Sequence, residues 1–363
     1  MNQICQKHPL PPPASFVATL LLLLFTFIWA PDIVRAQDDD DETTEADESK
    51  VKAQDQEFSA RGFNQLRIEQ EDKITVPLEK EEEVWNFLFA QFIADTVALK
   101  KLDPHFTAYF NEERFADTYF DTPSLQLYAM QSGVRHRRRV NLTNASDRKS
   151  GRELMQIKVN SISANTLERG ELKYGIRRST EYKTPEDGHP MLGIVKPSHR
   201  EDFKEQLIKL GLDPYSMRPI LTVHDSRRRI YIQRDRKTIM SISLDHVISR
   251  RLSAKAEFVE IEPELNEIVF TEADSATRNY MEETNAKICT MIEARFPEVK
   301  RDLTPKYNKS FDALATRISF FRYLVRLDMD NKNGLAGFAT LSIATLVCGF
   351  IFVKRLVAGK TSC

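Results

Sequence analysis

The segment Arg67-Ile-Glu-Gln-Glu-Asp-Lys-Ile-Thr-Val76 is the most informative stretch of this chain. If it forms a strand, successive side chains point to opposite faces, so Glu69, Glu71 and Lys73 share one face. Two carboxylates suit a divalent metal ion, and a lysine beside them suits phosphate oxygens. The competing interpretation is a solvated strand face, because segments of the form E-x-E-x-K are common there.

Two further motifs follow in order. Tyr119-Phe-Asp-Thr-Pro-Ser-Leu-Gln-Leu127 precedes the basic stretch Gly133-Val-Arg-His-Arg137. With E-x-E-x-K they resemble the CYTH domain of the triphosphate tunnel metalloenzyme superfamily, from about residue 65 to about residue 314. The chain is also similar to the VTC domain of polyphosphate polymerases, which shares this opening. The resemblance implies an α+β fold, an antiparallel eight-stranded β tunnel barrel with flanking helices.

The resemblance also implies a charged tunnel with assigned roles. Residues expected to act in catalysis are Glu69, Glu71 and Lys73. The expected ligands of Mg²⁺ or Mn²⁺ are Glu69, Glu71, Glu171, Asp245, Glu260 and Glu262. The expected phosphate-binding residues are Lys73, Arg135, Arg137, Lys158, Arg169, Lys173, Arg228 and Lys306.

Two of these assignments depend on local details of the sequence. Lys173 ends Arg169-Gly-Glu-Leu-Lys173, where the family usually has R-x-E-x-E. A cation in place of a carboxylate favours longer phosphate chains. Arg228 is chosen from three adjacent arginines because it lies three residues before Tyr231, as in the R-x-x-Y pattern of the family.

The remaining pattern is dominated by strands. Alternating segments predict strands over 64–77, 117–120, 134–142, 154–160, 168–177, 219–224, 230–234, 238–244 and 257–262, and helices over 78–99, 201–210 and 274–295. The segment 180–197 reads as a turn-rich insertion. Antiparallel strands with charges at alternate positions can close into a barrel with a polar lumen.

The two ends of the chain predict a membrane location. The apolar run 16–30 and Val34-Arg-Ala36 indicate a secretory signal peptide over 1–36, with an uncleaved anchor as the alternative. Residues 335–353 hold no charge and are long enough for a transmembrane helix. Lys354 and Arg355 favour a cytoplasmic tail over 354–363, so the main domain would be extracytoplasmic, periplasmic or lumenal. Between these ends we expect an acidic disordered linker over 37–62, the tunnel domain over 63–315 and a juxtamembrane segment over 316–334.

Composition narrows the function classes. The net charge is −1, but residues 37–48 carry eight acidic side chains and no basic one. The basic residues cluster elsewhere, for example over 135–139 and 227–229. We expect no nucleic-acid partner, because the secretion signals disfavour one and few aromatic residues lie between the basic ones. Cys289 is the only cysteine between the two ends, so no disulfide can form within the domain.

These features predict a membrane-anchored, metal-dependent phosphohydrolase acting on triphosphate or polyphosphate chains. Its partners would be inorganic polyphosphate, tripolyphosphate or a nucleoside triphosphate, and the membrane through 335–353. The alternatives are a VTC-like polyphosphate polymerase, a non-catalytic polyphosphate-binding module and a structural barrel with no ligand. An extracytoplasmic location disfavours synthesis from ATP, which is scarce there.

Overall fold

The computed structural model describes residues 67–143, 152–160, 167–178, 181, 183–318 and 320–330. The expected signal peptide, the acidic linker, the apolar segment 335–353 and the tail all lie outside these residues. Among the helices of the described residues, none combines the length and the apolar character that a membrane span requires.

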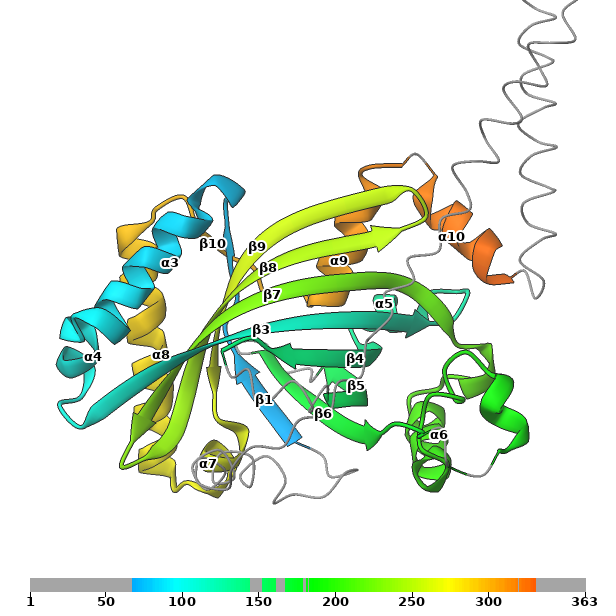
Figure 1. Ribbon diagram of the computed structural model, residues 1–363, viewed down its shortest axis with the longest axis horizontal. Coiled ribbons are helices and arrows are strands. Elements are labelled where there is room, and N and C mark those ends of the chain that lie inside the picture. The colour runs from blue at the N-terminus through cyan, green and yellow to red at the C-terminus, as the bar shows by residue number, and fades with distance from the viewer. Residues whose placement is uncertain are drawn as a thin grey trace, which may run out of the picture. The chain divides into compact units, whose positions relative to one another are not determined.

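Eight antiparallel strands close into a barrel (Figure 1). Their order around it is β1 (Arg67–Glu71), β6 (Leu167–Gly175), β5 (Arg152–Asn160), β4 (Gly133–Asn141), β3 (Phe106–Asp121), β7 (Arg218–Arg234), β8 (Lys237–Arg251) and β9 (Ala254–Leu265). The pairing of Glu71 with Glu264 joins β1 to β9 and completes the ring. Two short strands extend the sheet, since β2 (Ile74–Val76) pairs with β9 and β10 (Lys300–Arg301) pairs with β2. The expected eight-stranded barrel with flanking helices is confirmed.

The opening strand is interrupted, although one continuous strand was expected. β1 ends at Glu71, and the backbone N–H of Asp72 donates to the carbonyl of Pro263 at 2.9 Å. The strand resumes as β2 at Ile74. Lys73 therefore lies in the break and not within a strand.

The strands β3 and β7 are much longer than the sequence pattern predicts, and β8 and β9 also exceed the expected strands 238–244 and 257–262. The expected pieces 219–224 and 230–234 are parts of the single strand β7, and 117–120 is the end of β3. Both strands place charged side chains at alternate inward positions and pair with each other along their whole length. The sequence pattern therefore missed the full length of these strands, because a strand is recognised by alternating apolar and polar residues and here the inner face is polar as well.

One group of helices packs on β3, β8 and β9, and its member α7 also contacts β1. It comprises η1 (Leu78–Lys80), α3 (Glu81–Phe89), the π-helix η2 (Ala90–Ala94), α4 (Val97–Leu102), α7 (Glu267–Glu272) and α8 (Ser275–Arg295). Val84 and Leu88 of α3 and Ile288 of α8 are buried in one apolar cluster with Ile230 and Ile261 of the barrel. Asp274 caps α8 by accepting a hydrogen bond from the backbone N–H of Thr277 at 2.7 Å. The expected helices 78–99 and 274–295 are present, the first divided into several pieces.

A second apolar cluster lies around the helices α5 (Gln126–Ala129), α6 (Arg200–Lys209), α9 (Lys306–Ala315) and α10 (Phe321–Asp330), with the short turns η4 (Pro185–Gly188), η5 (Pro197–His199) and η6 (Pro214–Ser216) nearby. Tyr119 of β3 stacks on Tyr307 of α9, with ring centroids 5.2 Å apart. Asp121 accepts hydrogen bonds from the backbone N–H groups of Leu127 and Tyr128 and from the hydroxyl of Tyr307. The D-T-P turn thus joins α5 and α9 to the end of β3.

Candidate functional site

The inner face of the barrel carries charged side chains on every strand. Side chains of paired residues lie on the same face of a sheet, and the register places Glu69 opposite Arg169, Lys158 opposite Glu171 and Asp245 opposite Glu260. The first two pairs join opposite charges, whereas the third brings the carboxylates of Asp245 and Glu260 together. Burying such groups costs several kcal/mol per ion unless they are compensated. Here the compensation comes from ion pairs between neighbouring strands.

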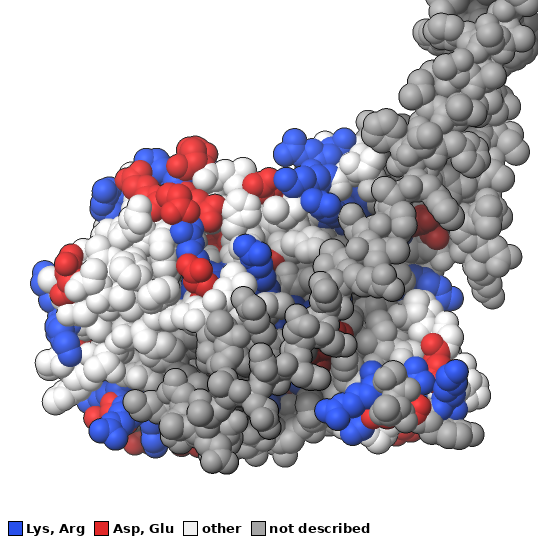
Figure 2. All heavy atoms as spheres, viewed as in Figure 1, with Lys and Arg blue, Asp and Glu red and all other residues white. Residues whose placement is uncertain are grey.

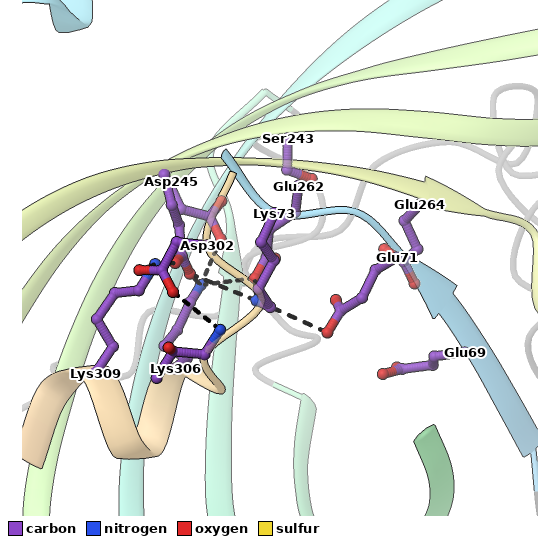
Figure 3. A network of polar contacts seen from close by, with 12 residues as sticks. Glu69, Glu71, Lys73, Ser243, Asp245, Glu262, Glu264, Asp302, Lys306 and Lys309 are labelled. Carbon is purple, nitrogen blue, oxygen red and sulfur yellow. Dashed lines mark hydrogen bonds and ion pairs between the residues drawn. The ribbon is translucent and has the colours of Figure 1, made fainter. Parts of the chain in front are cut away.

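Asp245, Glu260 and Glu262 form a buried acidic group, which we call the acidic trio. One carboxylate oxygen from each lies within 4.8 Å of the others. Lys73 from the β1–β2 break and Lys306 from the start of α9 converge on this trio (Figure 3). Lys73 contacts Glu262, and its Nζ lies 3.7 Å from an oxygen of Glu260. Burial lowers the pKa of Lys73, but the surrounding carboxylates raise it above its usual value, so this lysine stays charged.

A second acidic group contains Glu69, Glu171 and Glu267, whose ligand oxygens also lie within 4.8 Å of one another. Lys158 pairs with Glu69 at 2.5 Å and Lys173 with Glu171 at 2.6 Å. Burial raises the pKa of Glu171, but these lysines outweigh it and hold the pKa below its usual range. The carboxylates expected to form one metal site are therefore divided between two groups.

Glu71 belongs to neither acidic group. Its Oε1 lies 3.3 Å from Arg169 and 3.7 Å from Lys73. In Figure 3 it stands on β1 beside Glu69 and Glu264, away from Lys306. Glu71 is therefore placed to hold cations of the chain.

Arginines of β4 form a third part of the inner face. Arg135 and Arg137 both donate to Asp117 of β3, at 3.0 and 2.7–2.8 Å. Burial raises the pKa of Asp117, but the two guanidinium groups lower it to about 2. Arg138, the residue after Arg137, is exposed on the outside, as the two-residue period of a strand requires. Asp117 thus orients two expected phosphate-binding arginines.

The family model of the CYTH domain matches residues 87–286. The chain belongs to this family. A closer relation of this CYTH protein to the VTC domain stays a prediction.

Solved structures resemble the CYTH protein weakly. A putative adenylate cyclase from Bacillus halodurans is 18% identical, with 63% of this chain and 91% of that chain covered and a TM-score of 0.35. A putative adenylyl cyclase from Hippeastrum, described as having a dominant triphosphatase activity, is 15% identical, with 60% and 87% covered and a TM-score of 0.29. The Mimivirus capping enzyme triphosphatase is 8% identical, with 68% and 98% covered and a TM-score of 0.32. These scores are too low to carry an argument, and no curated protein matches the chain.

One assignment in this CYTH domain is corrected by the structure. Arg228 was expected inside the barrel, but it faces outward from β7 and donates to Glu81 and Glu82 of α3. Arg227 is the buried residue, and it donates to Asp245 and Glu262. The physical reason is the two-residue period of the strand: Asp225, Arg227 and Arg229 share the inner face, so Arg228 cannot.

Several inner residues were not expected from the sequence. They are Glu113, Asp117, Asp225, Arg227, Arg229, Glu264, Glu267 and Lys309. The sequence pattern could have predicted some of these residues. Glu264, for example, extends the E-x-E pattern of Glu260 and Glu262 by one more alternate position. Lys309 follows Lys306 by one helical turn and lies 2.9 Å from Glu260. Glu267 lies on α7, and only the fold brings it to Glu69 and Glu171.

The acidic trio has the composition of a magnesium or manganese site, because these ions prefer carboxylate oxygens. The side-chain oxygen Oε1 of Glu260 is buried and accepts no hydrogen bond within the described part of the chain, and the same holds for Oδ1 of Asp225. Such oxygens have ligand capacity to spare. The residues present therefore fit a divalent cation, although Lys73, Lys306 and Arg227 contact the same carboxylates.

Proposed function

We propose that this CYTH protein is a metal-dependent phosphohydrolase that acts on triphosphate or polyphosphate chains. The observation that carries the proposal is the buried acidic trio on the same inner face as a belt of buried lysines and arginines. The trio suits a divalent cation, and the belt suits a linear polyanion. The family membership agrees with this chemistry.

The metal, Mg²⁺ or Mn²⁺, would be held by Asp245, Glu260 and Glu262, and Glu69, Glu171 and Glu267 offer a second set of oxygens. When bound, such an ion polarises phosphoryl oxygens and lowers the pKa of coordinated water. The oxygens of Glu69 and Glu171 face Lys158 and Lys173, so this second set lies beside cations that would hold the substrate.

The side chain of Arg169 is a specific argument for a phosphate ligand inside the barrel. Its side chain is 5% exposed, and its Nε and Nη2 have no hydrogen-bond acceptor among the described residues. Leaving buried charged donors unsatisfied is costly, so such a group is placed to donate to a ligand. Phosphate oxygens are the acceptors that a guanidinium fork matches best. Arg135 and Arg137, already oriented by Asp117, would hold further oxygens of the same chain.

A second candidate function is a polyphosphate-binding module without catalysis. Lys73, Lys306 and Arg227 already neutralise the acidic trio, so the carboxylates could serve only to hold these cations in place. In that case binding of polyphosphate would need no metal. Synthesis of polyphosphate from ATP is a further alternative, which an extracytoplasmic location disfavours.

The deciding experiment measures phosphate release from tripolyphosphate by the purified protein with and without Mn²⁺, together with calorimetric binding of tripolyphosphate in a chelator. A hydrolase releases phosphate only when the metal is present. Binding in the chelator with no release under either condition would establish the module instead. Growth of phosphate chains from ATP would establish the polymerase.

We also propose that residues 335–353 anchor the protein in a membrane with its barrel outside the cytoplasm. The support is the uncharged segment itself, the basic residues after it and the signal-like N-terminus. A barrel held there would meet phosphate chains outside the cytoplasm.

A further inference from the structure

Helix α10 is fixed to the barrel by one face. Phe321, Val325 and Met329 recur every four residues and are 2%, 0% and 5% exposed. The ring of Phe321 packs against that of Phe311 in α9, with centroids 5.3 Å apart. Arg251 at the end of β8 donates to Asp328, which ties the helix to the β8–β9 turn. The orientation of α10 on the barrel is therefore determined by packing on several elements.

The opposite face of α10 exposes aromatic and basic side chains. Tyr323 of α10 is 61% exposed. Phe320, the residue before the helix, is 81% exposed, the highest value among the large apolar side chains of the described residues. Arg326 of α10 and Arg317, in the turn between α9 and α10, are also exposed. Figure 2 shows lysine and arginine side chains gathered where Figure 1 places α9 and the turn that leads to α10. Aromatic rings among arginines are typical of segments that lie in the interface between lipid and water.

The short distance in sequence between α10 and the uncharged segment 335–353 indicates what covers this face of the helix. The helix ends at Asp330, and the uncharged segment begins at residue 335. The four residues between them span at most about 14 Å, because a fully extended chain advances about 3.3–3.6 Å per residue. A span inserted over 335–353 would therefore hold α10 at the membrane surface.

We propose that α10 lies on the lipid surface of the membrane entered by residues 335–353, with Phe320 and Tyr323 in the headgroup region and Arg317 and Arg326 on anionic headgroups. This inference rests on the proposed anchor. It goes beyond the anchor because it assigns an orientation: the α9 end of the barrel faces the bilayer. Each basic residue near an anionic surface strengthens binding by about fivefold.

The test uses the full chain reconstituted in vesicles of phosphatidylcholine and phosphatidylglycerol whose acyl chains carry bromine, a short-range quencher of tryptophan. Phe320→Trp places a reporter on the proposed surface. Ile208→Trp is the matched control, because Ile208 is 62% exposed on α6, which lies well apart from α10 in Figure 1. The unaltered chain supplies the background emission of its own tryptophans. Alkaline carbonate extraction reports separately whether the chain is inserted.

We expect brominated lipid to quench the added emission at position 320 and to leave that at position 208 unchanged. Adding Arg317→Gln and Arg326→Gln should reduce the quenching. Metal-dependent phosphate release should be unchanged in all variants, which separates this inference from the proposed chemistry. A carbonate-resistant chain with no quenching at 320, or with equal quenching at both positions, would refute the lipid contact alone and leave a protein partner as the occupant of this face. Extraction by carbonate would refute the anchor and the contact together.

Discussion

Replacement of Arg227 by glutamine should damage both stability and phosphate binding, whereas the same change at Arg228 should do little. The two residues are neighbours on β7, and each change removes one positive charge. Arg227 is 6% exposed and donates to Asp245 and Glu262 inside the barrel. Arg228 reaches Glu81 and Glu82 on the outside and lies over the ring of Trp85 at 5.0 Å. The two variants therefore have the same net charge and differ only in whether the lost arginine lies inside or outside the barrel.

The structure sets the expected magnitudes. Removing one partner from a buried ion pair costs up to about 3–5 kcal/mol in the free energy of unfolding when the other charge is left unpaired. Lys306 and Lys73 remain on Asp245 and Glu262 when Arg227 is replaced, so the loss should lie below that limit. On the outer surface, the side chains of Arg228 and Glu81 are each 18% exposed and that of Glu82 is 73% exposed. An ion pair at such a surface contributes about 0–1 kcal/mol, and a cation–π contact adds about 0.5–1 kcal/mol. Loss of a charge-assisted contact to phosphate is worth about 1.5–3 kcal/mol, or roughly ten- to a hundredfold in affinity.

The assay combines urea denaturation, followed by circular dichroism, with calorimetric titration of tripolyphosphate. Arg227→Lys is the conservative control, since it keeps the charge but not the two-pronged contact with the carboxylates. We expect it to recover part of the stability and part of the affinity. Equal losses for the glutamine variants at 227 and 228 would refute a charged interior distinct from the outer surface. A larger loss at 228 would show that the register of β7 is displaced by one residue.

The remaining predictions concern the metal, the β4 register, pH and topology. Glu260→Gln should abolish Mn²⁺-dependent phosphate release while the circular dichroism spectrum stays intact, and an unchanged rate would show that the acidic trio is not the metal site. Arg137→Ala should weaken tripolyphosphate binding roughly ten- to a hundredfold. Arg138→Ala should leave binding unchanged, since Arg138 is exposed outside the barrel. Equal losses of affinity for the two variants in calorimetry would contradict a phosphate-binding tunnel. Burial lowers the pKa of His246, but hydrogen bonds to Glu81 and Glu257 outweigh it and raise the pKa above its usual value. The stability that these hydrogen bonds contribute is therefore complete below about pH 6.5 and is lost as the pH rises through the folded-state pKa of His246. His246→Gln should consequently lower the melting temperature more at acidic pH than at alkaline pH. An effect that does not depend on pH would rule out a charged histidine at this position. Protease added outside sealed cells should digest the barrel and spare the tail after Val353, and full protection of the barrel would place it in the cytoplasm.

The resemblance of the sequence motifs to the CYTH domain predicted the barrel, and local patterns predicted part of its interior. The two-residue period of E-x-E placed Glu69 and Glu71 on one face of β1, and both side chains are buried in the structure. Lys73 is buried as well, but it lies in the break after β1 and not on the expected continuous strand. The alternation on β4 placed Arg135 and Arg137 opposite to Arg138 for the same reason. Such patterns are readable because each depends only on residues close in the chain.

Other features had no local signal. Three adjacent arginines carry no alternation, so the choice between Arg227 and Arg228 could not be made from β7 alone. Pairing with β3 and β8 decides it, since Arg227 lies opposite Asp245 and Glu113. The charged residues within β3 and β7 likewise concealed the length of these strands, because their polar faces turn toward a polar interior.

The sequence by itself determined that carboxylates and cations lie at alternate strand positions, and its motifs indicated the fold class that holds them. Only the tertiary structure decided which carboxylates act together. Asp245 and Glu260 meet because β8 and β9 pair in one register, and Glu267 reaches Glu69 and Glu171 because α7 folds back against β1 and β6. The physical reason is that strand periodicity is encoded in neighbouring residues, whereas distances across a closed barrel depend on the register of all its strands at once.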